Sequence, residues 1–217
     1  MDVLKAPVSR ANEALGKKIC ESLLSNGYKS AVYVGTASEA LEAASDMIPD
    51  GASVGVPGTV TVRQIGLIQK LEDRGCQVIH HWDPSLNPEA KTERLTQENA
   101  ADWFVTSSNA ITHDGKMVNI DGAGNRVAAM AWGRGKILFV VGMNKAARDV
   151  ESAITRARDA ATPPNSMRVG LYTPCVEHGY CTDCSSPERA CRAVLILERA
   201  PFGRDAHVIL VGETLGY

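Results

Sequence analysis

Short hydrophobic strands alternate with helices along most of the chain, and this alternation is the feature that most restricts the fold. Strand-like runs at residues 30–35, 53–56, 77–82 and 102–106 are separated by helical patterns, and the most apolar run follows at residues 136–141. Parallel strands need long crossover connections, which are usually helices. The sequence therefore predicts an α/β fold with an open, mainly parallel sheet flanked by helices.

Capping residues and turn residues mark the helices. Residues 9–26 carry apolar side chains every four residues, residues 62–71 form a second such stripe, and Asn87-Pro88 begins a polar helix. A further helix is expected over residues 146–160, and we expect residues 162–165 (TPPN) to break it.

The last third of the chain departs from simple alternation. An Asp-Gly turn within residues 113–116 predicts a hairpin, and residues 193–197 and 207–211 are further strands, so we expect antiparallel additions to the sheet. We expect one domain over residues 1–217, with residues 162–192 forming a cysteine-rich, metal-binding insertion within it.

Four cysteines lie close together near the end of the chain, at Cys175, Cys181, Cys184 and Cys191, with the spacing C-x5-C-x2-C-x6-C. Four thiolates on one short loop can surround a single metal centre. A C-x2-C pair with a third cysteine a few residues upstream is typical of iron–sulfur proteins, so we expect a cluster of the 4Fe-4S type. Two alternatives stay open: a structural zinc ion, or disulfides and unligated thiols.

The surroundings of the cysteines bear on these alternatives. Zinc sites usually carry two C-x2-C knuckles, and this loop has only one. Disulfides need an oxidising compartment, whereas residues 1–11 do not resemble a signal peptide, so we expect a cytoplasmic protein. The other two cysteines, Cys20 and Cys76, lie among apolar residues and are expected to be small core side chains.

A first candidate binding segment follows the strand at residues 53–56. Thr59 and Thr61 lie where a turn enters a helix, and Thr61 with Gln64 has the spacing of a capping box. Free backbone N–H groups at such a helix start can bind a carboxylate or phosphate, with Arg63 adding charge. The alternative is a tight turn before a capped helix, without a ligand.

A second candidate segment is unusually rich in polar groups. Asn109 lies in the run 107–112, and Asn119 and Asp121 are two residues apart on one strand, which places them on one face. Asn125 and Arg126 follow two glycines, and an arginine is suited to hold a carboxylate or phosphate. The alternative is that Asp121 and Asn125 only cap the next helix.

Lys145 follows the most apolar strand at its carboxyl end, where ligands bind in open α/β sheets. The same rule directs attention to the loops at 57–63, 107–112, 121–126 and 142–145. The alternative for Lys145 is a solvated surface lysine. His80 and His81 end another strand without a carboxylate or cysteine nearby in the sequence, so we expect ordinary surface or core histidines there.

Composition and motifs exclude several functions. The 217 residues carry a formal net charge of −2, which gives no polycationic face for nucleic acid and no attraction to an anionic membrane. No apolar run reaches the length of a transmembrane helix. The chain has no P-loop, no strand-linked Gly-x-Gly-x-x-Gly, no Gly-x-Ser-x-Gly and no His-Glu-x-x-His. Standard nucleotide-binding and hydrolase motifs are therefore missing.

Several segments together resemble the LUD (lactate-utilisation) domain family. They are residues 107–112 (SSNAIT), 114–115 (DG), 118–127 (VNIDGAGNRV), 141–145 (VGMNK) and 212–217 (GETLGY). The resemblance covers nearly the whole chain. It implies a fold similar to the sugar-phosphate isomerase and CoA-transferase superfamily, and a link to the oxidation of L-lactate in complexes whose iron–sulfur subunits pass electrons onward.

Some members of this family carry a similar cysteine loop and others lack one. The chain has no second ferredoxin-type cysteine set, so it differs from the larger, two-cluster subunit of such complexes. The first hypothesis is a cytoplasmic iron–sulfur protein in the redox metabolism of a small organic acid. Arg126, Lys145, Asn119 and the turn at 59–61 would bind the acid beside the cluster.

Two rival hypotheses remain. One is an isomerase- or transferase-type enzyme with a zinc-stapled lobe, in which Asp121 or Glu213 is the general base and Arg126 anchors an anion. The other is a noncatalytic subunit that carries a cluster for another protein. The expected partners are a small carboxylate or phosphate ligand and a redox partner protein, without nucleic acid or membrane, and a homo-oligomer is compatible with the sequence.

Overall fold

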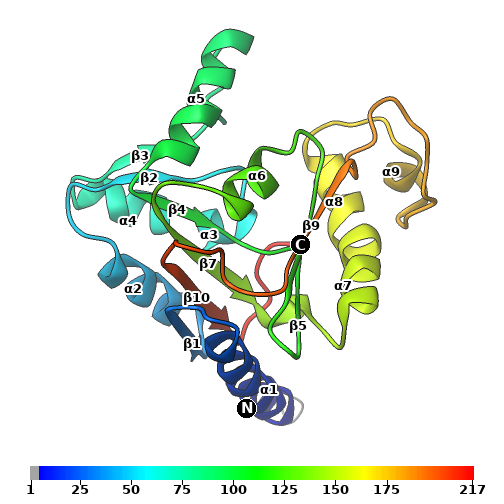
Figure 1. Ribbon diagram of the computed structural model, residues 1–217. Coiled ribbons are helices and arrows are strands. Elements are labelled where there is room, and N and C mark those ends of the chain that lie inside the picture. Colours follow the sequence, from blue (N-terminus) through cyan, green and yellow to red (C-terminus); the bar gives the residue numbers. More distant parts are fainter. Residues whose placement is uncertain (1–4) are drawn as a thin grey trace.

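The computed structural model describes residues 5–217 and confirms the α/β fold (Figure 1). The helices are α1 (Lys5–Ser25), α2 (Ala37–Met47), α3 (Val60–Gln64), α4 (Leu67–Asp73), α5 (Pro88–Ala100), α6 (Asn125–Ala131), α7 (Val150–Arg156), α8 (Thr162–Arg168) and α9 (Pro174–His178), with a 3-10 turn η1 (Met143–Lys145) and a π turn η2 (Ala157–Ala161). The strands are β1 (Ser30–Val34), β2 (Ser53–Gly55), β3 (Gln77–Ile79), β4 (Trp103–Thr106), β5 (Ala110–Thr112), β6 (Met117–Asp121), β7 (Lys136–Gly142), β8 (Ala146–Ala147), β9 (Ala193–Leu197) and β10 (Ala206–Val211).

The main sheet is parallel throughout, with six strands in the order β1-β10-β7-β4-β2-β3. Its central strands are apolar on both faces, as expected for a sheet covered on both sides. Along β7, Ile137 and Phe139 enter one core while Leu138 and Val140 enter the other. Successive side chains of a strand point to opposite faces, so this one run of residues joins both cores.

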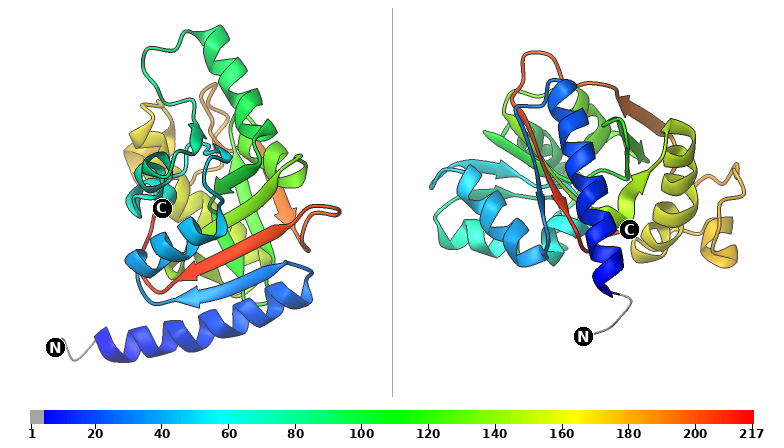
Figure 2. Two further views of the ribbon diagram at one scale, coloured as in Figure 1. Left: turned by 90° about the vertical axis from the view of Figure 1, so that its left-hand side faces the viewer. Right: turned by 90° about the horizontal axis from the view of Figure 1, so that it is seen from below.

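Helices and a second sheet cover the two faces. The first core packs against α1 and α6, and the second packs against α2, α3 and α4. Figure 2 shows α1 lying beside β1 and β10, with α2 on the opposite side of the sheet. Helix α5 extends away from the edge formed by β2 and β3 (Figure 1).

The second sheet has four strands in the order β8-β5-β6-β9 and contains the expected antiparallel pairs. Strands β5 and β6 form a hairpin around Gly115, whose φ of +80° lies in the left-handed region that glycine tolerates. One side of this sheet contributes Ile111 and Met117 to the first core. The other side packs Ala110 and Val118 against Ala153 of α7.

The expected helix break at residues 162–165 is wrong, because the chain stays helical from α7 through α8. Prolines cannot donate the next helical hydrogen bond, and their rings collide with the carbonyl four residues earlier. The helix avoids this conflict by widening into the π turn η2, in which the Thr162 N–H donates to Ala157 O, five residues back. Pro163 and Pro164 then occupy the first turn of α8, where no donor is needed.

Other boundaries differ in smaller ways. The stripe at 62–71 is two helices, because Gly66 adopts a left-handed φ of +77° between α3 and α4. The strand expected over 77–82 ends at Ile79. Cys20 and Cys76 are buried, as expected of core side chains. Among residues 5–217, none of the helices combines the length and hydrophobicity that crossing a bilayer requires.

Candidate functional site

A cleft of about 550 Å³ opens at the carboxyl ends of the parallel strands. The loops that follow β2, β4 and β7 of the main sheet contribute to its lining, as does the end of β6 from the second sheet. The lining includes residues 58–61, 106–109, 120–123 and Lys145. Ligands bind at this edge in open α/β sheets because the loops after neighbouring strands converge there. Of the residues predicted to bind a ligand or to act in catalysis, the cleft is lined by Thr59, Thr61, Asn109, Asp121, Asn125, Arg126 and Lys145.

Lys145 lies at the base of the cleft and is only 3% exposed, which rules out the solvated-lysine alternative. Its Nζ donates 2.9 Å hydrogen bonds to Thr61 Oγ1 and Ser107 Oγ, and both of these acceptors are neutral. Burial, reinforced by the positive charges of Arg156 and Arg126, lowers the pKa of Lys145 to about 7. An ammonium group with neutral partners is a suitable site for an anionic ligand.

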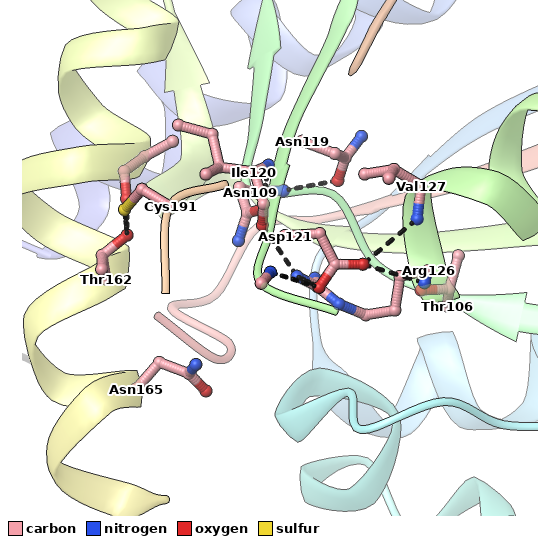
Figure 3. A network of polar contacts seen from close by, with 12 residues as sticks. Thr106, Asn109, Asn119, Ile120, Asp121, Arg126, Val127, Thr162, Asn165 and Cys191 are labelled. Carbon is pink, nitrogen blue, oxygen red and sulfur yellow. Dashed lines mark hydrogen bonds and ion pairs between the residues drawn. The ribbon is translucent and has the colours of Figure 1, made fainter. Parts of the chain in front are cut away.

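Arg126 and Asp121 form a unit at the start of α6 (Figure 3). The Asp121 carboxylate accepts hydrogen bonds from the backbone N–H groups of Gly122, Arg126 and Val127, at 2.9 to 3.3 Å. It also lies 3.2 Å from Arg126 Nη2, which donates to Ile120 O as well. Asp121 therefore caps α6 and orients Arg126 toward the cleft.

Asn119 is fully buried, outside the lining of the cleft. Its Oδ1 accepts a hydrogen bond from Asn109 N–H, while Asn109 Oδ1 accepts one from Ile120 N–H. The two asparagines thus hold the loop after β4 against β6, as Figure 3 shows. Asn119 is hydrogen-bonded to a lining residue and does not line the cleft itself, so it supports the cleft wall.

The turn at 59–61 differs from the expected capping box. Thr59 is the N-cap residue of α3 and its side chain makes no capping bond, while Thr61 lies inside the helix. Thr61 Oγ1 instead accepts the hydrogen bond from Lys145, and Gln64 Oε1 accepts one from Gly216 N–H. The capping-box prediction is wrong because both side chains are engaged by segments distant in sequence.

Glu213 does not reach the cleft. Its side chain is exposed, and its carboxylate accepts a 3.3 Å hydrogen bond from Ala37 N–H at the start of α2. The structure therefore brings Asp121 but not Glu213, the other candidate general base, together with Arg126 and Lys145.

The opposite wall of the cleft comes mainly from residues 162–192, which were predicted from the sequence only to bind a metal. This segment contributes Asn165, Arg168, Glu188, Arg189 and Arg192 to the lining. With Arg126 and Lys145, the lining has five cationic side chains and two carboxylates, those of Asp121 and Glu188. The cleft is therefore electropositive in a chain whose net charge is −2.

The four clustered cysteines all line a second cavity, of about 20 Å³. Cys175 is the buried residue of α9, and the other three are partly exposed on a loop without helix or strand. The Asp183 N–H donates to Cys181 Sγ at 3.4 Å, and Thr173 Oγ1 lies 3.2 Å from Cys175 Sγ. None of the six cysteines is in a disulfide.

Arg189 holds this loop in shape. Its Nε donates to Cys191 O at 2.8 Å, its Nη1 donates to Cys184 O, and its Nη2 pairs with Asp183 at 2.7 Å. Asp183 has a φ of +47°, a left-handed conformation that costs free energy for a residue with a side chain. Arg189 compensates by fixing the turn between Cys181 and Cys184.

The donor set fits an iron–sulfur cluster, since all four cysteines line one cavity and the Asp183 N–H donates to Cys181 Sγ. Zinc would need sulfur atoms about 2.3 Å from one centre. Within residues 5–217, no three His, Cys, Asp or Glu side chains lie close enough together to share one metal ion. A space of about 20 Å³ holds about one water molecule, which is smaller than a cluster, so binding one would need the loop to lie further out.

Sequence reasoning missed one pair at the rim. His81 lines the cleft, and its Nδ1 lies 2.7 Å from Glu98 Oε1. His81 follows β3, so the carboxyl-end rule that identified the other loops also applied here. Its carboxylate partner lies 17 residues further along the chain, on α5, and only the fold brings the two together.

Comparison with known proteins gives one family and one fold. A family model described as the LUD domain matches residues 17–211. The chain is also similar to the crystal structure of a DUF162 family protein from Deinococcus radiodurans, with a TM-score of 0.53 and 14% identity, over 92% of this chain and 98% of that one. At that identity the likeness shows the fold alone. No curated protein matches the chain.

Proposed function

The chain belongs to the LUD domain family, and from the geometry of its cleft we propose that it binds a small organic acid, such as lactate, beside an iron–sulfur cluster and serves in the redox metabolism of that acid. The observation that carries this proposal is that the cleft and the cysteine cavity share a wall. Thr162, Arg189 and Ala190 line both the cleft and the cysteine cavity. A ligand in the cleft is thus separated from the four thiols by a single layer of residues.

The charge of the cleft supports an acid as the ligand. Arg126 of α6 and Lys145 of η1 line one wall, and Arg168, Arg189 and Arg192 line the other. Buried hydroxyls of Thr61 and Ser107 add polar contacts at the base. At about 550 Å³ the cleft is of the size usual for ligand sites, and it leaves room for an acid larger than lactate.

Cys175, Cys181, Cys184 and Cys191 would hold the cluster, which supplies one-electron transfer when bound. Conversion of a 2-hydroxy acid into its 2-oxo acid releases two electrons and two protons. The proposed acceptor of these electrons is a partner electron-transfer protein. Three of the four cysteines are partly exposed, which suits transfer to a partner at the surface.

The test measures ligand binding and the cluster together. L-Lactate is titrated into anaerobically purified protein by calorimetry, and the electron paramagnetic resonance of the dithionite-reduced protein is recorded with and without lactate. We expect binding and a shifted spectrum, and we expect Lys145→Met to lose both. The proposal would be contradicted if the wild-type protein bound neither L-lactate nor inorganic phosphate. It would also be contradicted if lactate bound and the spectrum stayed unchanged.

A second candidate is an isomerase- or transferase-type enzyme that works by acid–base chemistry, with zinc in the cysteine loop. The specific observation in its favour is Lys145, whose pKa of about 7 lets it exchange a proton at neutral pH. Stoichiometric zinc, together with ligand turnover that survives Cys184→Ser, would favour this candidate over the first.

A further inference from the structure

The pair formed by His81 and Glu98 lies at the rim of the cleft and has no part in the function proposed above. The Glu98 carboxylate is 1% exposed and its Oε1 is 2.7 Å from His81 Nδ1. The His81 side chain is 21% exposed and lines the cleft. A buried carboxylate therefore holds a histidine whose other side faces the ligand space.

Burying the Glu98 carboxyl costs free energy. It is the one buried residue of the 13-residue helix α5, and burial raises the pKa of its carboxyl while the bond to His81 lowers it. A carboxylate in such surroundings is unfavourable unless it is paired with a hydrogen-bond donor. Most helices are anchored by apolar side chains, so an anchor that is a glutamate indicates a role for its partner.

The backbone is shaped to bring the two together. Helix α5 approaches β2 so closely that a Cβ on Gly55 would lie 2.0 Å from the backbone oxygen of Glu98. On the other side of the imidazole, a Cβ on Gly58 would be 3.9 Å from His81 Nε2. Within residues 5–217 the Nε2 atom has no hydrogen-bond partner, so it is free to meet a ligand.

The tautomer follows from the pairing. When Glu98 is ionised its carboxylate only accepts hydrogen bonds, so Nδ1 carries the proton in that state, and in the neutral ring Nε2 is then an acceptor. The other side chains that bring charge to the cleft are mostly donors: Arg126, Lys145 and the three arginines of the opposite wall. His81 Nε2 thus supplies an acceptor where donors dominate.

We infer that His81 accepts the hydrogen bond of a hydroxyl group on the bound acid and, on reaction, its proton, with Glu98 as the positioning residue. In that step the O–H bond breaks with its electron pair left on oxygen, the N–H bond forms at Nε2, and the Glu98 carboxylate offsets the imidazolium charge. This inference rests on the anion-binding cleft proposed above. It adds which side chain binds the hydroxyl group of that acid and takes its proton.

Two inorganic anions of matched charge and shape distinguish anion binding by the cleft from hydrogen bonding of a ligand hydroxyl to His81. At pH 8 phosphate and sulfate are both mainly dianions, but only phosphate carries an O–H donor, and free imidazole is neutral. We expect wild-type protein to bind phosphate at least about fivefold more tightly than sulfate, the effect of one hydrogen bond. In His81→Phe the two affinities should be equal, with sulfate binding unchanged, while the exposed control His113→Phe keeps the preference.

The outcomes are distinct. If neither anion binds to the wild type, the proposed function fails and this inference fails with it. If both anions bind and the preference is absent, or survives in His81→Phe, only the inference is overturned. Because His81→Phe leaves Glu98 buried without its partner, nitrogen NMR of wild-type histidines gives a second readout. We expect the Nδ1–H tautomer for His81 at pH 8, and the Nε2–H tautomer would contradict the assignment.

Discussion

The Nε atom of Arg189 donates a 2.8 Å hydrogen bond to the backbone oxygen of Cys191, and the same side chain lines the cleft. One residue thus belongs to both the cysteine loop and the ligand site. Its other nitrogens hold Cys184 O and Asp183, so the spacing of the last three cysteines depends on this guanidinium.

Replacing Arg189 should therefore weaken the cluster without removing a ligand to it. We expect anaerobically purified Arg189→Leu to lose its iron to a chelator several times faster than wild type, measured by the decay of visible absorption. Arg148→Leu changes an exposed arginine on another part of the surface and is the control. Equal rates of loss in Arg189→Leu and wild type would show that the loop keeps its shape by other means.

Lys145 should make stability depend on pH. Its folded pKa of about 7 lies below the unfolded value of about 10.4, so the unfolded chain binds more protons between them and stability rises with pH over that range. Below pH 7 burial of the ammonium costs about 3 to 5 kcal/mol. We expect Lys145→Met to be more stable than wild type at pH 6 in urea denaturation, with the difference shrinking by pH 10.

The exposed Lys91→Met is the control for that comparison and should leave the pH profile unchanged. The protonated Lys145 ammonium favours the binding of anions. The phosphate affinity of the wild type should therefore fall as the pH rises through 7 and this group loses its proton. Parallel stability profiles for wild type and Lys145→Met would contradict the assignment of a buried lysine with a lowered pKa.

Asp121 should matter for both the fold and the ligand. Because its carboxylate caps α6 and holds Arg126, we expect Asp121→Ala to cost about 1 to 2 kcal/mol of unfolding free energy, the usual loss for a helix cap. Phosphate affinity should fall too, since Arg126 loses its orienting partner. A variant that binds phosphate normally would show that Arg126 is positioned without Asp121.

The close approach of α5 to β2 gives a steric prediction. A Cβ on Gly55 would overlap the Glu98 backbone at 2.0 Å, whereas a Cβ on Gly58 would meet Trp82 Nε1 at 3.4 Å and His81 at 3.9 Å. We expect Gly55→Ala to lose at least about 2 kcal/mol of stability, since a packed backbone cannot yield without strain. Gly58→Ala, the matched control, should unfold near the wild-type urea midpoint.

Local patterns were sufficient for the sheet and for much of the cleft. Strand β7 and the Asp-Gly hairpin follow from short-range hydrophobic spacing and turn chemistry, and the carboxyl-end rule located Lys145 and Arg126. Contacts between distant segments were beyond that reasoning. The Glu98 partner of His81 depends on how α5 docks on the sheet, and the π turn before Pro163 depends on the helix continuing past the prolines.

The second wall of the cleft illustrates the same limit. Arg168, Arg189 and Arg192 look like solvated charges in the sequence, and they come to line the cleft only because α8 and the cysteine loop lie beside the strand ends. For Asn119 the difference is the reverse. Its position on β6 suggested contact with a ligand, whereas in the structure it is fully buried and hydrogen-bonded to Asn109. Strand periodicity gives the face of a side chain but not what lies above it.

Iron and acid-labile sulfide analysis of anaerobically purified protein, together with its visible absorption spectrum, tests the central claim most directly. If Cys175, Cys181, Cys184 and Cys191 hold a cluster beside the cleft, the protein should contain about four iron and four sulfide per chain, and Cys184→Ser should contain much less. Zinc in place of iron, or the four thiols joined in pairs in the native protein, would contradict it.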